Sequence, residues 1–367
     1  MILENKTLLG CLIDGEKIKI ESHPDLYRAR APKSPDFDWD KVDGMLLGLA
    51  IGDALGITTE GMLPSQRISR FSEVRDYLPN RYTGRRLGYP SDDTQLAFWT
   101  LEQLLEDRRF DPEKLAAKFS SRRIFGIGHT VKQFVANIKS GVWWDEAGPE
   151  SAGNGSLMRI APMVIPWIKS SEPGILADTA LSAMLTHNDS LSISSCLSFV
   201  IMLWELLDMK KSPEPMWWIQ RYTEEAARYE LDDLYSPRGG RFTGFKGRGW
   251  AYVDQCVRWA WDNNLSVLDA CNAWYSGAYL LETIPSAIYI LMKHGHETEE
   301  AIIRAVNDTK DNDTIAAIVG AAVGALHGKS AIPRRWIDGL TGRTTDADEG
   351  KIFELLDEAR RTFGTVS

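Results

Sequence analysis

The sequence predicts an all-α protein that carries a small N-terminal β-hairpin and an extended arm. From residue 43 onward, the segments that are long enough to judge repeat their apolar residues with a helical period, and strand signals are scarce. Two stripes of small residues also recur at four-residue spacing, which is typical of helices that pack with their backbones close together. With 44% hydrophobic residues among 367, the chain can bury one large core.

The N-terminal segment, residues 1–38, differs from the rest of the chain. Apolar-rich runs at residues 7–13 and 16–20 flank Asp14-Gly15, a pair that favours a tight turn, so we expect a β-hairpin here. The next stretch, HPDLYRARAPKSPDFDWD, contains three prolines, which oppose a regular helix, and a basic cluster of Arg28, Arg30 and Lys33. We expect it to form an extended arm, and we place the main domain at residues 39–367.

Helices are expected where apolar residues recur with a period of about 3.6, most clearly at residues 92–106, 112–119, 190–209, 253–261 and 297–306. One stripe of small residues comprises Gly44, Gly48, Gly52 and Gly56, and the other comprises Ala316, Gly320 and Gly324. Close helix packing explains these glycines, so we assign them no catalytic role. Residues 239–249 are rich in glycine and contain Arg241, Lys246 and Arg248, which predicts a mobile surface loop between helices.

Composition and charge argue against several classes of function. A net charge of -9 and a pI near 5.3 are unsuited to nucleic-acid binding, which needs a basic face. The four cysteines form no CxxC pair and have no histidine partners at zinc-finger spacing, as expected in a reducing cytoplasm. The apolar run at residues 45–57 is too short, and too interrupted by Asp53, to span a bilayer. Because the N-terminus does not resemble a signal sequence, we expect a cytoplasmic protein without membrane contact.

Two acidic clusters are the most informative feature for chemistry. Residues 91–94 read Ser-Asp-Asp-Thr, residues 311–314 read Asp-Asn-Asp-Thr, and an apolar helical run follows each of them. One interpretation is helix capping, because such side chains satisfy free backbone N–H groups and acids suit the positive end of the helix dipole. The other is a metal site, because hard cations such as Mg²⁺ prefer oxygen ligands, and the two clusters can supply them around a pair of ions. The spacing alone leaves both interpretations open.

Five motifs in this order resemble those of the ADP-ribosylglycohydrolases. They are GMLLGLAIGDALGITTE at residues 44–60, SDDT at 91–94, SAGNGSLMRIAP at 151–162, LTHND at 185–189 and NDTKDNDTIAAIVGAAVGALHGKSAIP at 307–333. The resemblance covers roughly residues 40–340. It implies a compact all-α catalytic domain with a binuclear magnesium site between helices, with manganese as an alternative ion. The family includes enzymes that reverse the ADP-ribosylation of arginine.

The resemblance also implies roles for individual residues. The first metal motif of the family matches Ser91, Asp92 and Asp93, and the second matches Asp311, Asp313 and Thr314. Glu60 matches a family glutamate beside the ribose of the substrate, although alone it would be interpreted as a solvated acid after a helix. Glu60 and Asp93 are the candidates for proton transfer, and the sequence does not decide between them.

Other motif residues are implied to contact the substrate. The loop of Gly153, Asn154, Gly155 and Ser156 matches the family loop along the diphosphate, where glycines let backbone N–H groups approach an anion. Alone, this loop would pass for an ordinary turn. His187 matches a histidine near the ribose, with a structural hydrogen-bonding role as the alternative. Trp143 and Trp144 are candidates to stack on adenine, but core packing is the plainer interpretation in a chain with 13 tryptophans.

The sequence departs from the family pattern at two places. Ser91 replaces the threonine of many members, which retains a hydroxyl ligand. Thr309-Lys310 replaces the usual glycine pair before the second metal motif, and a lysine there could assist the phosphates or crowd them. Since all the expected acids are present, the sequence favours an active enzyme.

The implied reaction is hydrolysis of the N-glycosidic bond between ribose and a protein side chain, with arginine as the favoured acceptor. The implied partners are an ADP-ribosylated protein and a cognate ADP-ribosyltransferase toxin bound through residues 1–38, as in immunity proteins paired with interbacterial toxins. The arm could also be a packed decoration of the domain. Two alternatives stay open: a housekeeping hydrolase without a toxin partner, and a non-enzymatic binding homologue.

Overall fold

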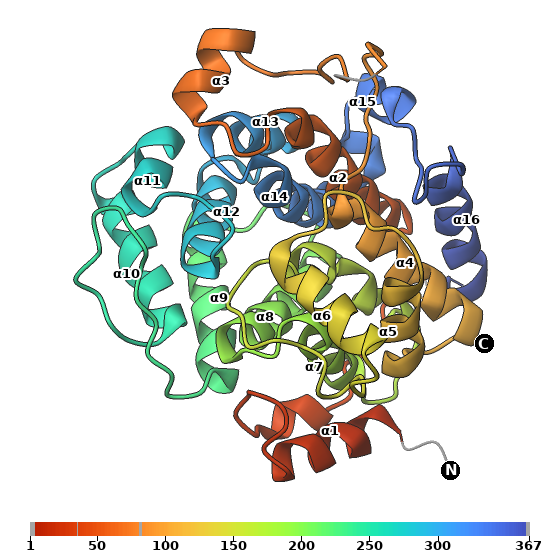
Figure 1. The fold of residues 1–367 in the computed structure, drawn as a ribbon. Coiled ribbons are helices and arrows are strands. Elements are labelled where there is room, and N and C mark those ends of the chain that lie inside the picture. The colour runs from red at the N-terminus through yellow and green to blue at the C-terminus, as the bar shows by residue number, and fades with distance from the viewer. Residues whose placement is uncertain (1–3, 35, 81–82, 365–367) are drawn as a thin grey trace.

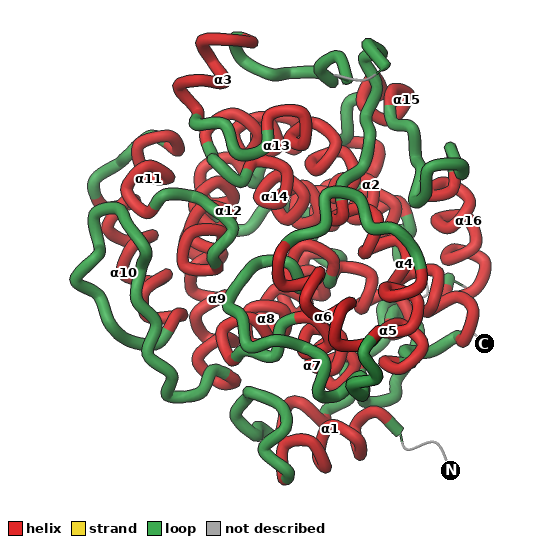
Figure 2. The backbone as a smooth tube through the Cα atoms, in the orientation of Figure 1, coloured by secondary structure: helices red, strands yellow, loops and turns green. Residues whose placement is uncertain are grey.

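The computed structural model describes residues 4–34, 36–80 and 83–364, and within these ranges it contains helices, loops and isolated β-bridges but no strand (Figures 1 and 2). The all-α fold class is therefore confirmed. The α-helices are α1 (Asn5–Asp14), α2 (Asp40–Gly56), α3 (Pro64–Phe71), α4 (Asp92–Asp107), α5 (Pro112–Ser121), α6 (His129–Lys139), α7 (Ile175–Thr186), α8 (Ser190–Leu206), α9 (Pro215–Tyr229), α10 (Gly249–Asp262), α11 (Val267–Trp274), α12 (Leu280–His294), α13 (Thr298–Asp308), α14 (Asn312–His327), α15 (Arg334–Gly339) and α16 (Lys351–Phe363). The five helices expected from periodicity correspond to α4, α5, α8, α10 and α13.

Helices α2 and α14 form the centre of the molecule (Figure 1). The two glycine stripes face each other, so that a Cβ atom added at Gly48 would overlap the carbonyl of Gly320, and one added at Gly52 would overlap that of Ala316. The absence of a side chain at Gly48 and Gly52 permits this approach of the two backbones. The predicted close packing is thus confirmed, and it brings the C-terminal end of α2 against the N-terminal end of α14.

The apolar character of α2 reflects burial within the protein. The segment Asp40–Thr59 is long and apolar enough to cross a membrane, but 89% of its most apolar stretch is buried inside the fold. Core helices of large domains have this composition because they are surrounded by other helices on all sides.

The predicted N-terminal β-hairpin is wrong, because residues 5–14 form helix α1. Leu8 and Leu12 are four residues apart, as are Leu9 and Ile13, so the apolar residues also fit a helical face, and Leu9 and Leu12 are buried. Asp14-Gly15 ends this helix: the N–H of Gly15 donates to the carbonyl of Cys11. A pair that favours a hairpin turn is equally suited to a helix C-terminus.

The segment after α1 packs onto the main body of the protein beside α7 (Figure 1). Ile18, Ile20 and Leu26 are buried, and residues 24–27 form a short 3₁₀ helix. Lys33 is buried too, and its Nζ donates to the carbonyl of Trp204 and to Asp208 Oδ2, both at 2.5 Å. Lys33 is therefore not available to a partner protein, contrary to our expectation for the basic cluster. Residues 1–3 and 35 of the predicted arm lie outside the described residues, and the boundary at residue 38 stays a prediction.

The glycine-rich stretch at residues 239–249 lies in the long connection between α9 and α10, on the left of Figure 1. Its placement as a surface loop is confirmed, with Gly249 as the first residue of α10. The backbone of Tyr235 pairs with that of Gly247 in an isolated bridge, so the loop doubles back on itself.

Candidate active site

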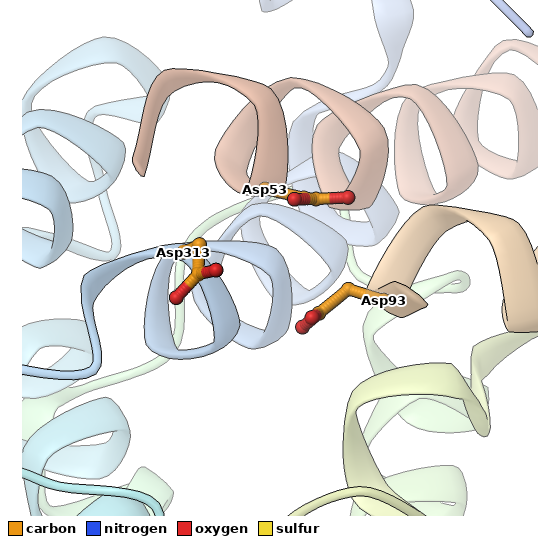
Figure 3. Close-up of side chains that lie close together, drawn as sticks. All are labelled: Asp53, Asp93 and Asp313. Carbon is orange, nitrogen blue, oxygen red and sulfur yellow. The ribbon is translucent and has the colours of Figure 1, made fainter. Parts of the chain in front are cut away.

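The two acidic clusters meet in one cavity of about 400 Å³ between the ends of α2, α4 and α14. The first cluster starts α4 and the second starts α14, so sequence segments more than 200 residues apart share the site (Figure 3). Most of the predicted site residues line this cavity, namely Glu60, Asp92, Asp93, Gly153, Asn154, Gly155, His187, Asp311, Asp313 and Thr314. Ser91 and Ser156 do not belong to its lining.

Helix capping explains only part of the first cluster. Ser91 is the N-cap residue of α4, and its Oγ accepts a hydrogen bond from the N–H of Asp93 at 3.2 Å. The same hydroxyl donates to Asp93 Oδ2 at 3.0 Å, which orients the carboxylate. The other oxygen, Asp93 Oδ1, is buried and has no hydrogen-bond partner in the part of the chain that the structure describes. A buried carboxylate oxygen without a donor is costly, and a bound cation would satisfy it.

Asp53 is a site residue that sequence reasoning missed. It is fully buried in α2, and its carboxylate accepts hydrogen bonds from the N–H of Ser91 at 2.9 Å and from both the N–H and the hydroxyl of Thr94, at 3.1 Å and 2.5 Å. These contacts fix the start of α4 against the end of α2. The available signal was a single acid inside an otherwise apolar run, because an unpaired charge there would be strongly unfavourable.

Five carboxylates gather into two trios that share one member. Asp53, Asp93 and Asp313 have oxygens that all lie within 4.8 Å of one another, and so do Glu60, Asp311 and Asp313 (Figure 3 for the first trio). Asp313 Oδ1 is buried and lacks a hydrogen-bond partner among the described residues, as Asp93 Oδ1 does. Such a density of oxygen ligands around unpartnered atoms fits hard divalent cations.

The electrostatics of the cluster also favour a cation. Burial, followed by the charge of Asp53, raises the pKa of Asp92 to about 8. Burial raises the pKa of Asp311 to about 6, and it raises the pKa values of Asp93 and Asp313 well above the usual range, reinforced by their acidic neighbours. Without compensation, Asp92, Asp93 and Asp313 would hold protons near neutral pH, and Asp311 would do so in mildly acidic solution. Positive charge bound among them would restore the ionised forms.

The second acidic cluster is held by side chains that sequence reasoning also missed. Asn312, between the two aspartates, is buried and donates to the carbonyl of Gly56 at 3.2 Å and to Thr59 Oγ1 at 2.9 Å. Arg67 is fully buried and donates to the carbonyl of Thr309 at 2.9 Å. These contacts tie the start of α14 to the end of α2 and to α3.

The loop at residues 153–155 links this cluster to the far wall of the cavity. The side chain of Asn154 donates to Asp311 Oδ2 at 2.6 Å and to Thr283 Oγ1 at 3.0 Å. Its N–H donates to the carbonyl of Ala278 at 3.0 Å. Asn154 therefore connects the glycine loop, the second acidic cluster and the segment before α12.

His187 packs beneath the glycine loop. A Cβ atom on Gly155 would lie 2.7 Å from Cε1 of His187, so the ring occupies the space that a side chain at residue 155 would need. Burial, followed by the charge of Arg159, lowers the pKa of His187 to about 3. The imidazole is therefore neutral at physiological pH, and it can act on a ligand through hydrogen bonds but not as a cation.

Three of the other residues singled out in the sequence lie apart from the cavity wall. Ser156 is buried, and its hydroxyl is 2.6 Å from that of Ser192 in α8. Trp144 is buried in the core, and Trp143 has 58% of its surface exposed. Neither tryptophan lines the cavity, whereas the aromatic side chain of Tyr279 does.

Most of the chain is similar to known proteins. A family model described as ADP-ribosylglycohydrolase matches residues 33–363. An uncharacterized protein of Archaeoglobus fulgidus is 31% identical over 325 residues, which cover 86% of this chain and 97% of that protein. The ADP-ribosylarginine hydrolase Tri1 of Serratia proteamaculans is 26% identical over 322 residues, covering 82% of this chain and 75% of the relative.

Two further matches extend this likeness. The ADP-ribosyl-[dinitrogen reductase] glycohydrolase of Rhodospirillum rubrum is 24% identical over 324 residues, which cover 86% of this chain and 96% of that enzyme. A solved structure described as an ADP-ribosylglycohydrolase-related protein complex aligns with a TM-score of 0.65 at 24% identity, covering 90% of this chain and 99% of the solved one. At that identity the structural match supports the fold.

Proposed function

This chain belongs to the ADP-ribosylglycohydrolase family, and from that premise we propose that it is a magnesium-dependent hydrolase that removes ADP-ribose from arginine side chains of proteins. The observation that carries the proposal is the pair of carboxylate trios that share Asp313, a residue that lines the cavity. The names of the relatives from Serratia proteamaculans and Rhodospirillum rubrum support an ADP-ribosylated protein as substrate, and the first of them supports arginine as the acceptor.

Asp313 belongs to both trios, so we place it between two ions, each of which takes further ligands from one acidic cluster. Asp53 is the member least free to be a ligand, because its carboxylate already accepts hydrogen bonds from Ser91 and Thr94. The ligand set that we propose for two Mg²⁺ ions, with Mn²⁺ as an alternative, is Ser91, Asp92, Asp93, Asp311, Asp313 and Thr314, with Glu60 beside it. When bound, the ions would supply positive charge that orients the ribose hydroxyls and polarises a water molecule.

The proposed reaction forms a bond between a water oxygen and C1″ of the ribose and breaks the bond between C1″ and the arginine nitrogen. One proton leaves the water, and the departing guanidine takes one up. Glu60 is our candidate for this transfer, because partial burial and the charge of Asp53 raise the pKa of its carboxyl, and because it lines the cavity near its opening. Asp93, which is buried deeper, is the alternative, and it is also part of the proposed ligand set.

We propose that the diphosphate of the substrate lies along Gly153, Asn154 and Gly155, where the absence of side chains on the two glycines lets an anion approach the backbone. Neutral His187 would then fix the loop and offer a hydrogen bond rather than a charge. We further propose a cytoplasmic location, since all four cysteines are free thiols.

The direct test is incubation with a protein ADP-ribosylated on arginine, with detection of released ADP-ribose. We expect release in the presence of Mg²⁺, and none with a chelator until Mg²⁺ is restored. A matched substrate modified on serine is the control for the acceptor. Release that persists in chelator would refute the metal dependence, and preference for the serine substrate would refute the acceptor.

As a second candidate function, we propose that the protein binds an ADP-ribosyltransferase toxin, as expected from the sequence, through fewer residues than the whole basic cluster. Of the basic cluster, Lys33 is buried, whereas the Arg28 side chain is 75% exposed and Arg30 is half-buried. An acidic surface of an ADP-ribosyltransferase could therefore be bound by Arg28 and Arg30 without disturbing the packed part of residues 1–38.

A further inference from the structure

A second cavity, of about 660 Å³, adjoins the one that holds the acidic clusters. The two cavities share four wall residues, Glu60, Arg238, Ala278 and Asp311, so they are neighbouring compartments of one cleft. The second compartment is completed by Gly61, Gly239, Tyr275, Gly277 and Lys310. A substrate that fills both compartments must cross between them beside Glu60 and Asp311.

The wall of the second compartment has an unusual backbone. Tyr275 and Ser276 are consecutive residues with positive φ angles, 82° and 42°, in a region that residues other than glycine seldom adopt. The carbonyl of Ser276 accepts hydrogen bonds from the N–H groups of Lys310 at 3.3 Å and Asp311 at 3.0 Å. Backbone strain of this kind persists where surrounding contacts hold it, often at a functional site. Here it fixes the segment that presents both Lys310 and Asp311.

Two cationic side chains, Lys310 and Arg238, line this compartment. The Lys310 Nζ lies 3.9 Å from the centre of the Tyr275 ring and also contacts the hydroxyl of that tyrosine. Arg238 binds the buried carboxylate of Glu282 through two hydrogen bonds of 3.0 Å and 2.7 Å, and its side chain is still 60% exposed. Both cations are thus held in place by the protein while they line the cavity.

The residues that hold Arg238 are themselves fixed. A Cβ atom on Gly277 would lie 2.5 Å from Glu282 Oε2, so the absence of a side chain there lets the carboxylate take its position. The carbonyl of Gly277 accepts a hydrogen bond from Thr283 Oγ1 at 2.8 Å, and Thr283 in turn contacts Asn154 of the glycine loop. The position of Arg238 is therefore linked to the compartment proposed for ADP-ribose.

We propose that the second compartment binds the acceptor side of the substrate, and that Arg238 and Lys310 select protein segments with acidic residues next to the ADP-ribosylated side chain. This inference rests on the proposed function, which puts ADP-ribose in the first compartment and the bond to be broken beside Glu60. The modified side chain and its flanking residues then extend past Tyr275. Flanking carboxylates would meet the two cations there, whereas flanking lysines or arginines would be repelled.

The test compares two peptides that carry ADP-ribose on the same arginine and differ only in flanking aspartates or flanking lysines. Their affinity is measured by fluorescence anisotropy on protein with Asp93→Ala, in which turnover is expected to be lost, and their kcat/KM is measured on the unmodified enzyme. We expect the acidic peptide to be favoured about threefold to tenfold in both assays, because exposed ion pairs are individually weak. Raising the salt from about 50 mM to about 500 mM should reduce this ratio.

The informative variant is Lys310→Glu, because replacement of Arg238 would leave buried Glu282 unpaired. Lys310→Glu should abolish or reverse the preference. Lys211→Glu is the matched control: it makes the same charge change in the exposed α8–α9 connection, near the start of α2 and away from the site at the end of that helix. It should leave the preference unchanged.

The outcomes separate this inference from the proposed function. Hydrolysis of both peptides with equal kcat/KM, or a preference that survives Lys310→Glu, would overturn the acceptor compartment and leave the hydrolase intact. Absence of hydrolysis by the unmodified enzyme, with an affinity ratio that still depends on Lys310, would overturn the hydrolase and support the compartment as a binding site.

Discussion

At the scale of single residues, Asp313 is exceptional among the described acids of the site, because it is buried and belongs to both carboxylate trios. Without a cation, burial and then the charges of Asp311, Asp93 and Glu60 raise the pKa of its carboxyl and oppose its ionisation. A residue in this position should therefore be necessary for catalysis and unfavourable for the stability of the metal-free protein.

We predict that Asp313→Asn lowers hydrolysis by about 100-fold or more and stabilises the protein in chelator by about 1 kcal/mol, because asparagine removes a carboxyl that the metal-free fold forces to hold a proton. Mg²⁺ should raise the melting temperature of the unmodified protein, and should do so less for the variant, since a ligand that binds only the native state stabilises it. The measurements are turnover and thermal unfolding with and without chelator. Asp346→Asn, at an exposed residue, is the control, and full activity of Asp313→Asn would remove Asp313 from the site.

Local sequence could predict the residues whose partners lie nearby, such as Ser91 and Asp93 in one helix start. It could not predict Asp53 or Arg67 as parts of the site. Asp53 binds the N–H of Ser91, 38 residues away, and Arg67 binds the carbonyl of Thr309, 242 residues away. Neither pairing leaves a pattern in the chain, because a buried charge is explained only by the contacts that the fold brings to it.

At the scale of helices, the contact between α2 and α14 sets the distance between Asp53 and Asp313. We predict that Gly48→Ala destabilises the protein by about 1–3 kcal/mol, because the new Cβ would overlap the backbone of Gly320 and push the helices apart. Hydrolysis should fall as well, although Gly48 is outside the cavity.

Gly10→Ala provides the control for this change, measured by urea unfolding and by turnover. Gly10 lies within α1, where an added Cβ would meet only the Tyr27 hydroxyl at 3.8 Å. Alanine is also preferred over glycine inside a helix by up to about 1 kcal/mol, so Gly10→Ala should be neutral or stabilising. If the Gly48→Ala variant were as stable as the unmodified protein, the two helices could move apart without a loss of unfolding free energy.

Helix α1 is attached to α7 by a pH-sensitive contact. Asn5 Nδ2 donates to Asp178 Oδ1 at 2.6 Å, and burial raises the pKa of Asp178 to about 7. The folded state therefore keeps a proton that the unfolded chain loses near the ordinary aspartate pKa of 3.8. The contribution of this group to stability is fully present below pH 3.8 and is lost as the pH rises through about 7.

We predict that Asp178→Asn removes this pH-dependent loss of stability. The asparagine keeps a side-chain oxygen that can accept the hydrogen bond from Asn5. Relative to the unmodified protein, the variant should gain up to about 3 kcal/mol of unfolding free energy between pH 5 and pH 8. Urea unfolding at the two pH values measures the difference. Other buried acids titrate in the same range, and comparison with the unmodified protein cancels their effect. An unchanged pH dependence would show that Asp178 is ionised in the folded state.

The helices themselves were predictable where the apolar period was long, as in α4 and α8. The N-terminal hairpin was wrong because the run at residues 7–13 is too short for period alone to separate strand from helix. The decisive factor was burial of Leu9 and Leu12 in a helix that packs against α7, a tertiary contact that the local sequence does not specify.

At the scale of the whole molecule, exposed Arg28 is far in sequence from the residues that line the cavity, and it is not one of them. We predict that Arg28→Glu combined with Arg30→Glu weakens binding of an arginine-specific ADP-ribosyltransferase about tenfold or more, while hydrolysis of modified protein is unchanged. Deletion of residues 1–38 is a poorer test, because it would expose the core around Leu9, Ile18 and Leu26.

Binding is measured by surface plasmon resonance, with Arg123→Glu as a control at another exposed arginine. Equal affinity of the doubly substituted and unmodified proteins would refute the partner, and loss of hydrolysis in the double variant would show that these arginines support the fold.

The convergence of α2, α4 and α14 has a consequence for how the enzyme comes into being. Its carboxylates are contributed by residues between 53 and 313, so a chain still emerging from the ribosome holds only part of the ligand set until nearly all of it has been made. If the acids bind the proposed ions, binding would therefore coincide with completion of the fold. Until then, the acids are far apart, and each behaves as an ordinary solvated carboxylate. The ions would then be retained only by correctly folded protein, because only the folded chain brings enough negative charge together to bind them.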